Sequence, residues 1–147
     1  MKKTLLLLAV LITTTFIAHA QKETKLNIFF DGFYIAKTGS VPAANIEIFT
    51  YLQFYDDGTV YLQTVSSNDP QSVSKWFGRD KKYSKKGTYN IDGANISIHL
   101  DNKDTDDIKL EGFAEFFFKG VINQNNEMCM IRDNEKEEKC FVFAKTQ

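Results

Sequence analysis

The chain has 147 residues, with 18 Lys and Arg against 19 Asp and Glu and a formal net charge of −1. This length suits one domain. The near balance of charge argues against a nucleic-acid-binding role, because such proteins usually present a strongly basic face.

The first twenty residues have the pattern of a secretory signal peptide. Met1-Lys2-Lys3 is a short positive start, Leu5–Ile12 is an unbroken apolar run, and Ala18-His19-Ala20 fits an A-x-A cleavage site. The apolar run is too short for a transmembrane helix, which needs about 20 residues. We therefore predict cleavage near Ala20 and a secreted or periplasmic location, with no transmembrane segment in the mature chain.

The predicted organisation is a signal peptide at residues 1–20 and a single β-barrel domain at residues 21–147. Loss of Lys2 and Lys3 with the signal peptide would move the net charge from −1 to −3. Both cysteines, Cys129 and Cys140, belong to the mature part. In an oxidising compartment such a pair is first interpreted as a disulfide, with two buried free thiols as the alternative.

The strongest strand pattern is a hairpin in the first half of the chain. Ile46–Tyr55 and Thr59–Val65 are rich in aromatic and β-branched residues, and Asp56-Asp57-Gly58 between them is typical of a three-residue hairpin loop. The loop predicts a register in which one mostly apolar face contains the pairs Phe54–Val60, Leu52–Leu62 and Thr50–Thr64.

Further strands are predicted on both sides of this hairpin. Leu26–Ala36 is apolar around Asp31-Gly32, where we expect a bend or bulge. The later strands are expected in pairs: 87–91 with 95–100, 108–113 with 116–122, and 127–132 with 139–145. The last pairing also brings Cys129 opposite Cys140.

One short helix is predicted between the strands. Asp69 is a good N-cap and Pro70 suits the first helical position, while Gly78 can end the helix. Val73, Trp76 and Phe77 would lie on one face of it. The whole pattern predicts an all-β antiparallel meander of about nine strands that closes into a barrel, with a two-sheet sandwich as the alternative.

Four segments resemble the lipocalin-like (calycin-type) small exported bacterial proteins, most of which have no assigned function. They are Asp31-Gly32-Phe33-Tyr34, the stretch from Leu52 to Tyr61, Lys86-Gly87-Thr88-Tyr89, and Phe118-Lys119-Gly120-Val121-Ile122. The resemblance covers nearly all of the mature chain and implies a lipocalin-like barrel. True lipocalins carry Gly-x-Trp near the first strand, whereas Gly32 is followed here by Phe33 and Tyr34.

The sequence offers few catalytic residues. His99 is the one histidine after the predicted signal peptide, and it lies on the polar side of its strand. Nucleophilic catalysis needs a nucleophile, a base and a group that orients the base, and bonded cysteines would supply no thiolate. Glu47 and Glu115 are the candidate carboxylates for a hydrolase, because nearly all the others lie in predicted turns. We predict no catalytic residues and no enzyme activity.

Metal and cofactor sites are not predicted either. A structural zinc site usually has four Cys or His ligands, which this chain does not supply. The acidic run 101–107 is dense in oxygen ligands, but an EF-hand loop starting at Asn102 would need Gly and Glu where Asp107 and Phe113 stand. We interpret this run as an acidic turn and expect no metal and no cofactor.

Two surface features favour an interaction role. The segment 75–86 mixes basic residues with Trp76 and other aromatics, and it is either a binding site for an anionic partner or a solvated connection. The second face of the main hairpin carries Phe49, Tyr51 and Tyr61, which together with Trp76 would form an interaction surface. Cover by the predicted helix and the N-terminal segment is the alternative for this aromatic face.

The leading functional hypothesis is an exported binding protein that holds a small apolar ligand in the barrel. Ligands often bind in barrel mouths, although aromatic side chains can also fill a small barrel completely. The alternative is a ligand-free interaction protein of the periplasm or cell envelope that uses the aromatic face to bind an envelope protein. The residues expected to contact the apolar ligand are Leu52, Phe54, Leu62, Tyr89, Phe116 and Phe118.

Overall fold

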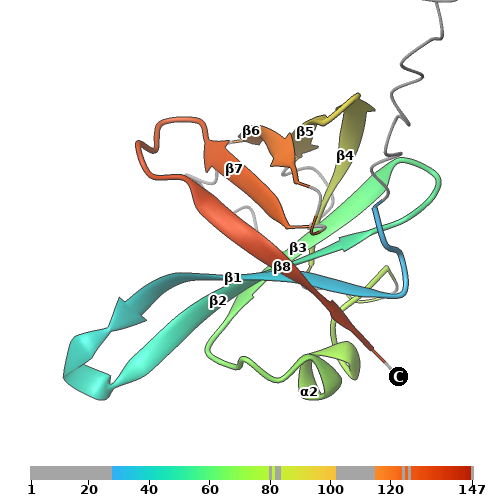
Figure 1. Ribbon diagram of the computed structural model, residues 1–147. Helices are drawn as coiled ribbons and strands as arrows, with labels where there is room; N and C mark the ends of the chain where they lie inside the picture. Colours follow the sequence, from blue (N-terminus) through green and yellow to red (C-terminus); the bar gives the residue numbers. More distant parts are fainter. Residues whose placement is uncertain are drawn as a thin grey trace, which may run out of the picture.

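The computed structural model describes residues 28–79, 81, 84–101, 115–123, 125 and 127–146. Within these residues, eight strands follow one another around a closed antiparallel barrel (Figure 1), and the first strand pairs with the last. The elements are β1 (Gly32–Val41), the 3-10 helix η1 (Pro42–Ala44), β2 (Ile46–Phe54), β3 (Thr59–Val65), α2 (Pro70–Ser74), β4 (Lys85–Asp92), β5 (Asn95–Leu100), β6 (Phe116–Ile122), β7 (Met128–Arg132) and β8 (Lys139–Lys145).

The predicted all-β class, the barrel and the single short α-helix are confirmed. The observed strand number is one below the predicted nine, and the additional predicted strand, residues 108–113, lies outside the described residues. The predicted signal peptide at residues 1–20 also lies outside them. Among the described residues, no helix has the length and apolar character needed to cross a bilayer.

The main hairpin has the register that the sequence predicts. β2 and β3 pair Phe54 with Val60, Leu52 with Leu62 and Thr50 with Thr64. Gly58 closes the turn with φ 83°, a left-handed conformation that glycine adopts without strain. The turn length and the apolar alternation therefore specify one register, as expected when one face of a strand is buried.

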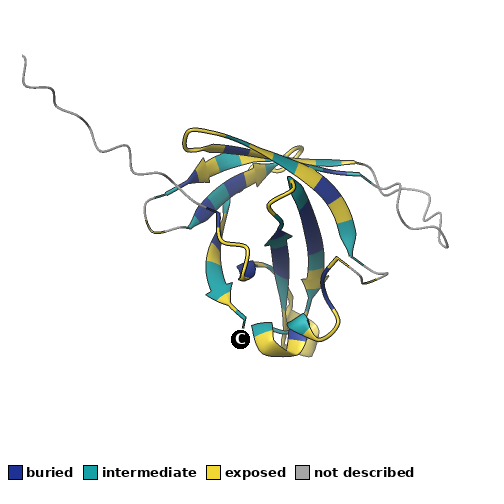
Figure 2. Ribbon diagram, turned by 90° about the vertical axis from the view of Figure 1, so that its right-hand side faces the viewer, coloured by how far each residue is buried: buried dark blue, intermediate teal, exposed yellow. Residues whose placement is uncertain are grey.

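Inward-facing side chains of all eight strands fill most of the barrel. Burial alternates along the strands, as Figure 2 shows, because successive side chains point to opposite faces. The buried apolar residues of this core are Ile28, Tyr34, Ala36, Leu52, Phe54, Val60, Leu62, Ile96, Ile98, Leu100, Ile122, Met128, Met130 and Phe141.

The partners of β6 differ from the prediction. β6 pairs with β5 on one side, including Leu100 with Phe116, and with β7 on the other, including Ile122 with Met128. The expected pairing of residues 116–122 with residues 108–113 is therefore wrong, because both edges of β6 are occupied. β5 and β6 pair although residues 101–115 separate them, and their distance in the sequence did not indicate this pairing.

The first strand is displaced along the chain from its predicted position. The prediction placed it at Leu26–Ala36, whereas β1 begins at Gly32 and continues to Val41. Gly32 lies against β8, where an added Cβ would stand 2.2 Å from the carbonyl oxygen of Ala144. Residues before this close approach leave the barrel wall, and Ile28 packs into the core instead. A register shift between Lys37 and Gly39 then lets β1 continue alongside β2.

The helix α2 begins where the sequence predicts but is shorter. The Asp69 side chain accepts a hydrogen bond from the backbone N–H of Gln71 at 3.0 Å, and Pro70 is the first helical residue. The helix ends at Ser74, four residues before Gly78. Phe77 is buried, but Trp76 is 42% exposed, so the predicted shared face of these two side chains is not formed.

The predicted disulfide is confirmed. Cys129 of β7 and Cys140 of β8 are directly opposite and bonded. The same register pairs Met128 with Phe141, whose side chains are buried inside the barrel. The bond therefore joins two strands whose inward faces are already in contact through the core.

Candidate functional site

A cavity of about 380 Å³ lies at one end of the barrel, which we call the pocket end. Its walls come from seven strands and from the turn between β7 and β8, so residues distant in sequence meet there. The lining residues are Thr38, Thr50, Leu62, Thr64, Lys85, Phe116, Phe118, Arg132, Glu135, Lys139 and Phe141.

The apolar part of the lining belongs to inward positions of β3, β6 and β8. Leu62 and Phe141 are buried, while Phe116 and Phe118 are partly buried and pack against the core. These side chains form an apolar floor between the core and the pocket. The volume falls within the range of about 300–1,000 Å³ that is common for small-molecule sites.

Two cations are held against one aromatic ring of the pocket. The Arg132 guanidinium carbon lies 3.6 Å from the centroid of the Phe116 ring, and Lys85 Nζ lies 4.1 Å from the same centroid. Both are cation–π contacts, in which a positive charge faces the electron-rich ring. Strand alternation explains their inward placement, because Arg132 follows Met128 and Met130 at every second position of β7.

The electrostatic environment of Lys85 reflects this crowding. Burial lowers the pKa of the Lys85 ammonium below its ordinary value, and the positive charge of Arg132 lowers this pKa further. Both effects disfavour the charged form of Lys85. A negatively charged group in the pocket would act in the opposite direction on both cations.

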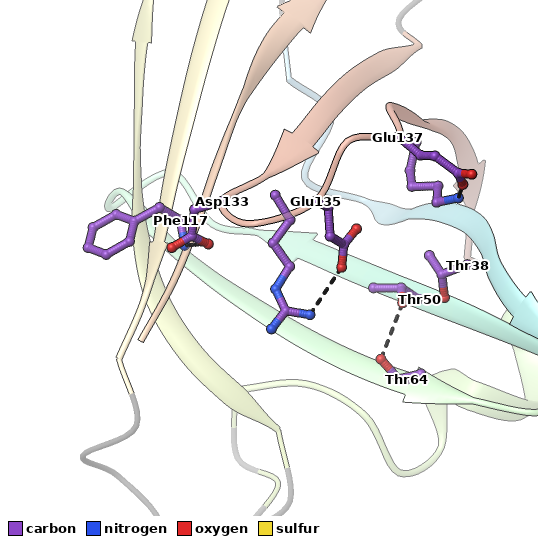
Figure 3. Close-up of polar contacts among 9 residues, drawn as sticks. Thr38, Thr50, Thr64, Phe117, Asp133, Glu135 and Glu137 are labelled. Carbon is purple, nitrogen blue, oxygen red and sulfur yellow. Dashed lines mark hydrogen bonds and ion pairs between the residues drawn. The ribbon is translucent and has the colours of Figure 1, made fainter. Parts of the chain in front are cut away.

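Carboxylates contact two of the pocket cations, Arg132 and Lys139. Arg132 Nη1 donates to Glu135 Oε1 at 3.3 Å, and this pair is drawn in Figure 3 beside the labelled Glu135. Lys139 Nζ donates to Glu137 Oε2 at 2.6 Å. The Nε–H of Arg132 is buried and has no hydrogen-bond partner among the described residues. Among the lining residues, three cations face one carboxylate, that of Glu135.

Three threonine hydroxyls line the pocket on β1, β2 and β3. Oγ1 of Thr50 lies 2.9 Å from Oγ1 of Thr38 and 3.2 Å from Oγ1 of Thr64, so the hydroxyls form a ladder across β1, β2 and β3 (Figure 3). Each hydroxyl carries one hydrogen and can also accept hydrogen bonds. Two bonds among three hydroxyls leave one hydroxyl hydrogen that can be donated outside the ladder.

The other end of the barrel, which we call the aromatic end, contains a row of packed aromatic rings. The rings of Phe143, Tyr34, Phe54 and Tyr89 follow one another with centroid separations of 5.0–5.4 Å. The Tyr34 hydroxyl accepts a hydrogen bond from the backbone N–H of Phe29 at 3.0 Å, and the Tyr89 hydroxyl donates to the Tyr55 carbonyl at 2.7 Å. The hydroxyls of Tyr34 and Tyr89 therefore both have hydrogen-bond partners, and the four rings pack against one another.

The residues predicted to contact a ligand divide between these two regions. Leu62, Phe116 and Phe118 line the pocket. Phe54 and Tyr89 belong to the aromatic end, and Leu52 is fully buried in the core. All six residues belong to one core cluster, but only half of them line the pocket.

The predicted interaction surface is largely covered. Tyr51 is fully buried and Tyr61 is 6% exposed, and both belong to a second apolar cluster with Val73 and Phe77 from the α2 segment. This arrangement corresponds to the alternative in which the helix covers the aromatic face. Phe49 is half-buried, and Trp76 is the member with an exposed ring.

The other residues of interest lie apart from the pocket. His99 stacks on Phe117 with centroids 4.4 Å apart, and its Nε2 lies 3.3 Å from Glu115 Oε2, with both side chains substantially exposed. Glu47 forms an ion pair with Lys37 on the long β1–β2 hairpin.

The acidic run 101–107 and the basic segment 75–86 are described only in part, and Lys85 of the basic segment lines the pocket. Of the acidic run 101–107, residues 102–107 lie outside the described part of the chain. Within the basic segment 75–86, Arg79 stacks on Tyr55 and pairs with Asp57, while residues 80, 82 and 83 lie outside the described part. Glu127, Cys129 and Cys140 lie close together, but the two sulfur atoms are bonded to each other and offer no thiolate.

Sequence reasoning missed the polar half of the pocket. Arg132 and Thr38 were not among the predicted site residues, and Lys85 was included only as part of the basic segment 75–86, although each lies at an inward position of its strand. The available signal was strand alternation, because every second side chain of a strand points to the same face. Arg132 follows Met128 and Met130 at every second position, which indicates that its charge points inward. An inward charge at a strand end is informative because charged side chains are rarely buried unless they are paired.

No protein-family model, curated protein or solved structure matches the chain at a significant level. The geometry and chemistry of the pocket are therefore the basis for a functional proposal.

Proposed function

We propose that this protein is an exported, lipocalin-like binding protein that holds a small ligand with an apolar part in the pocket and performs no catalysis. The observation that carries the proposal is the cavity of about 380 Å³ bounded by Leu62, Phe116 and Phe118. An apolar group placed there would be removed from water, and each buried CH₂ would contribute roughly 0.8 kcal/mol to binding.

Export is supported by two independent features. The N-terminal residues have the positive, apolar and small-residue pattern of a signal peptide. The disulfide between Cys129 and Cys140 is typical of an oxidising, extracellular type of environment. Together they favour a secreted or periplasmic location for the ligand-binding domain.

The first experiment is native mass spectrometry of the protein purified from its own host. A co-purifying small molecule of constant mass would support the proposal and identify the ligand class. A dimer without any bound molecule would instead favour the alternative of an interaction protein.

The second experiment measures 1-decanol binding by calorimetry in pocket-filling variants. Leu62→Trp and Thr64→Trp each place a large ring at a lining position, and both should weaken binding. Val142→Trp is the matched control, because Val142 is 58% exposed on the outside of β8. Equal affinity in all three variants and the wild type would contradict a ligand site at the pocket end.

A further inference from the structure

The proposed function leaves open what kind of polar group a ligand carries, and the walls of the pocket bear on this question. An apolar ligand needs only the floor formed by Leu62, Phe116 and Phe118. The pocket also contains positive charge and hydroxyl donors, and polar groups in an apolar site usually fix the orientation and specificity of a ligand.

The first observation is the placement of two like charges on a single ring. Arg132 and Lys85 lie 3.6 Å and 4.1 Å from the Phe116 centroid. This arrangement brings two cations together at the border of a partly desolvated cavity, where their repulsion is screened less than in bulk water. A single anionic group between them would be attracted to both.

The second observation is an incomplete set of acceptors around Arg132. Glu135 Oε1 accepts from Nη1 at 3.3 Å, a long contact for a charge-assisted hydrogen bond. The buried Nε–H has no acceptor among the described residues. Guanidinium groups bind carboxylate and phosphate through pairs of N–H donors, and among the described residues only one outer nitrogen of Arg132, Nη1, has an acceptor, Glu135.

The third observation concerns the threonine side chains that line the pocket. The ladder of Thr38, Thr50 and Thr64 retains one hydroxyl hydrogen beyond its two internal bonds. The same pocket therefore contains a hydroxyl donor and two cations, all of which can interact with a negatively charged oxygen. A cationic ligand head would be repelled by the two positive charges on the Phe116 ring, whereas an anionic head would be attracted to both.

We infer that the pocket recognises an amphiphile with an anionic oxygen headgroup, which Arg132 and Lys85 bind while the apolar chain packs on Phe116, Phe118 and Leu62. This inference rests on the proposed function and specifies its ligand class. Carboxylate, phosphate and sulfate heads share the required chemistry. The lowered pKa of Lys85 agrees with it, because a bound anion would offset both causes of that lowering.

The test compares two ligands that differ only in the headgroup. Calorimetry of the purified protein with sodium decanoate and with 1-decanol separates recognition of the charge from recognition of the chain. Decanoate should bind at least roughly ten-fold more tightly, as one or two charge-assisted hydrogen bonds imply. Decyl phosphate and decyl sulfate then distinguish the three kinds of anionic head.

Variants at the cations give the specific prediction. Arg132→Gln and Lys85→Met should each lower decanoate affinity roughly ten-fold while leaving decanol affinity nearly unchanged. Arg79→Gln is the matched control, because Arg79 also stacks on an aromatic ring and pairs with a carboxylate but lies outside the pocket. Its affinity for both ligands should equal that of the wild type.

The possible failures are distinguishable. If decanol binds as tightly as decanoate and Arg132→Gln changes neither affinity, anionic recognition is overturned while the proposed apolar binding site stands. If neither ligand binds, and no anionic decyl ligand does, the proposed function itself fails. Circular dichroism on each variant confirms that a loss of binding does not reflect a loss of fold.

Discussion

The two ends of the barrel are built from the same strands but filled differently. β2 places Phe54 at the aromatic end and Thr50 at the pocket end, and β4 likewise places Tyr89 and Lys85. Large rings meet edge to face or tilted at the first end, with centroids 5.0–5.4 Å apart. Shorter or charged side chains at the second end leave a cavity. The same strands form both ends, so the size of the inward-facing side chains decides where a small barrel can hold a ligand.

The largest expected effect comes from matched truncations of phenylalanine. Phe54→Ala should cost about 3–5 kcal/mol of unfolding free energy, because Phe54 is fully buried among other rings. Phe116→Ala should cost clearly less, since Phe116 already borders a cavity, but it should weaken decanoate binding by removing the ring beneath both cations. Urea denaturation and calorimetry measure the two effects. Equal stability losses would contradict the division of the barrel into two ends.

Loss of the disulfide should have the next largest effect. Cys129→Ala together with Cys140→Ala should lower the unfolding free energy by roughly 3 kcal/mol, as the loop-closure model gives for a loop of this size. β7 and β8 make few backbone pairs, so hydrogen exchange should accelerate in both strands. Amides around Phe54 should keep their protection. Uniform acceleration throughout the barrel would show that the bond stabilises both ends equally.

A smaller effect is expected for the hydroxyl of Tyr89. Tyr89→Phe removes the hydrogen bond to the Tyr55 carbonyl and should cost about 1 kcal/mol. Tyr61→Phe is a suitable control, because the described residues offer its hydroxyl no hydrogen bond. Thermal unfolding of the two variants separates loss of the Tyr89–Tyr55 hydrogen bond from the general effect of removing a tyrosine hydroxyl. Decanoate affinity should not change in either variant.

The smallest effect, and the one with opposite sign, concerns Lys85. The pKa of Lys85 is lowered from 10.5 by burial and then by Arg132, so the folded protein holds this proton less tightly than the unfolded chain. The unfavourable contribution of charged Lys85 to folding stability is fully present below its lowered pKa in the folded protein. It disappears as the pH rises from that value to 10.5, and stability therefore increases with pH in this window.

Lys85→Met removes that contribution. Without ligand, the variant should be at least as stable as the wild type at neutral pH, and the difference should narrow as the pH approaches 10.5. Unfolding curves across this pH range check the prediction. A variant that loses stability at neutral pH would indicate that the contact of Lys85 with Phe116 outweighs its desolvation.

Local patterns in the sequence were sufficient for much of the fold. The register of β2 with β3 followed from a three-residue loop and the alternation of apolar residues, because both act over short distances. The same reasoning placed Cys129 opposite Cys140 and Asp69 at the start of α2. It did not predict the partner of β6, because pairing across a long connection depends on the closure of the whole barrel.

The sequence by itself determined the all-β class, the hairpin registers, the disulfide pairing and which residues of each strand share a face. The tertiary structure alone decided the site. Strand alternation indicated that Phe54 and Phe116 both face inward. Only closure of the barrel placed Phe54 among other rings and Phe116 beneath Arg132 and Lys85. The physical reason is that a pocket is a space between strands, and its volume depends on side chains that meet from distant parts of the chain.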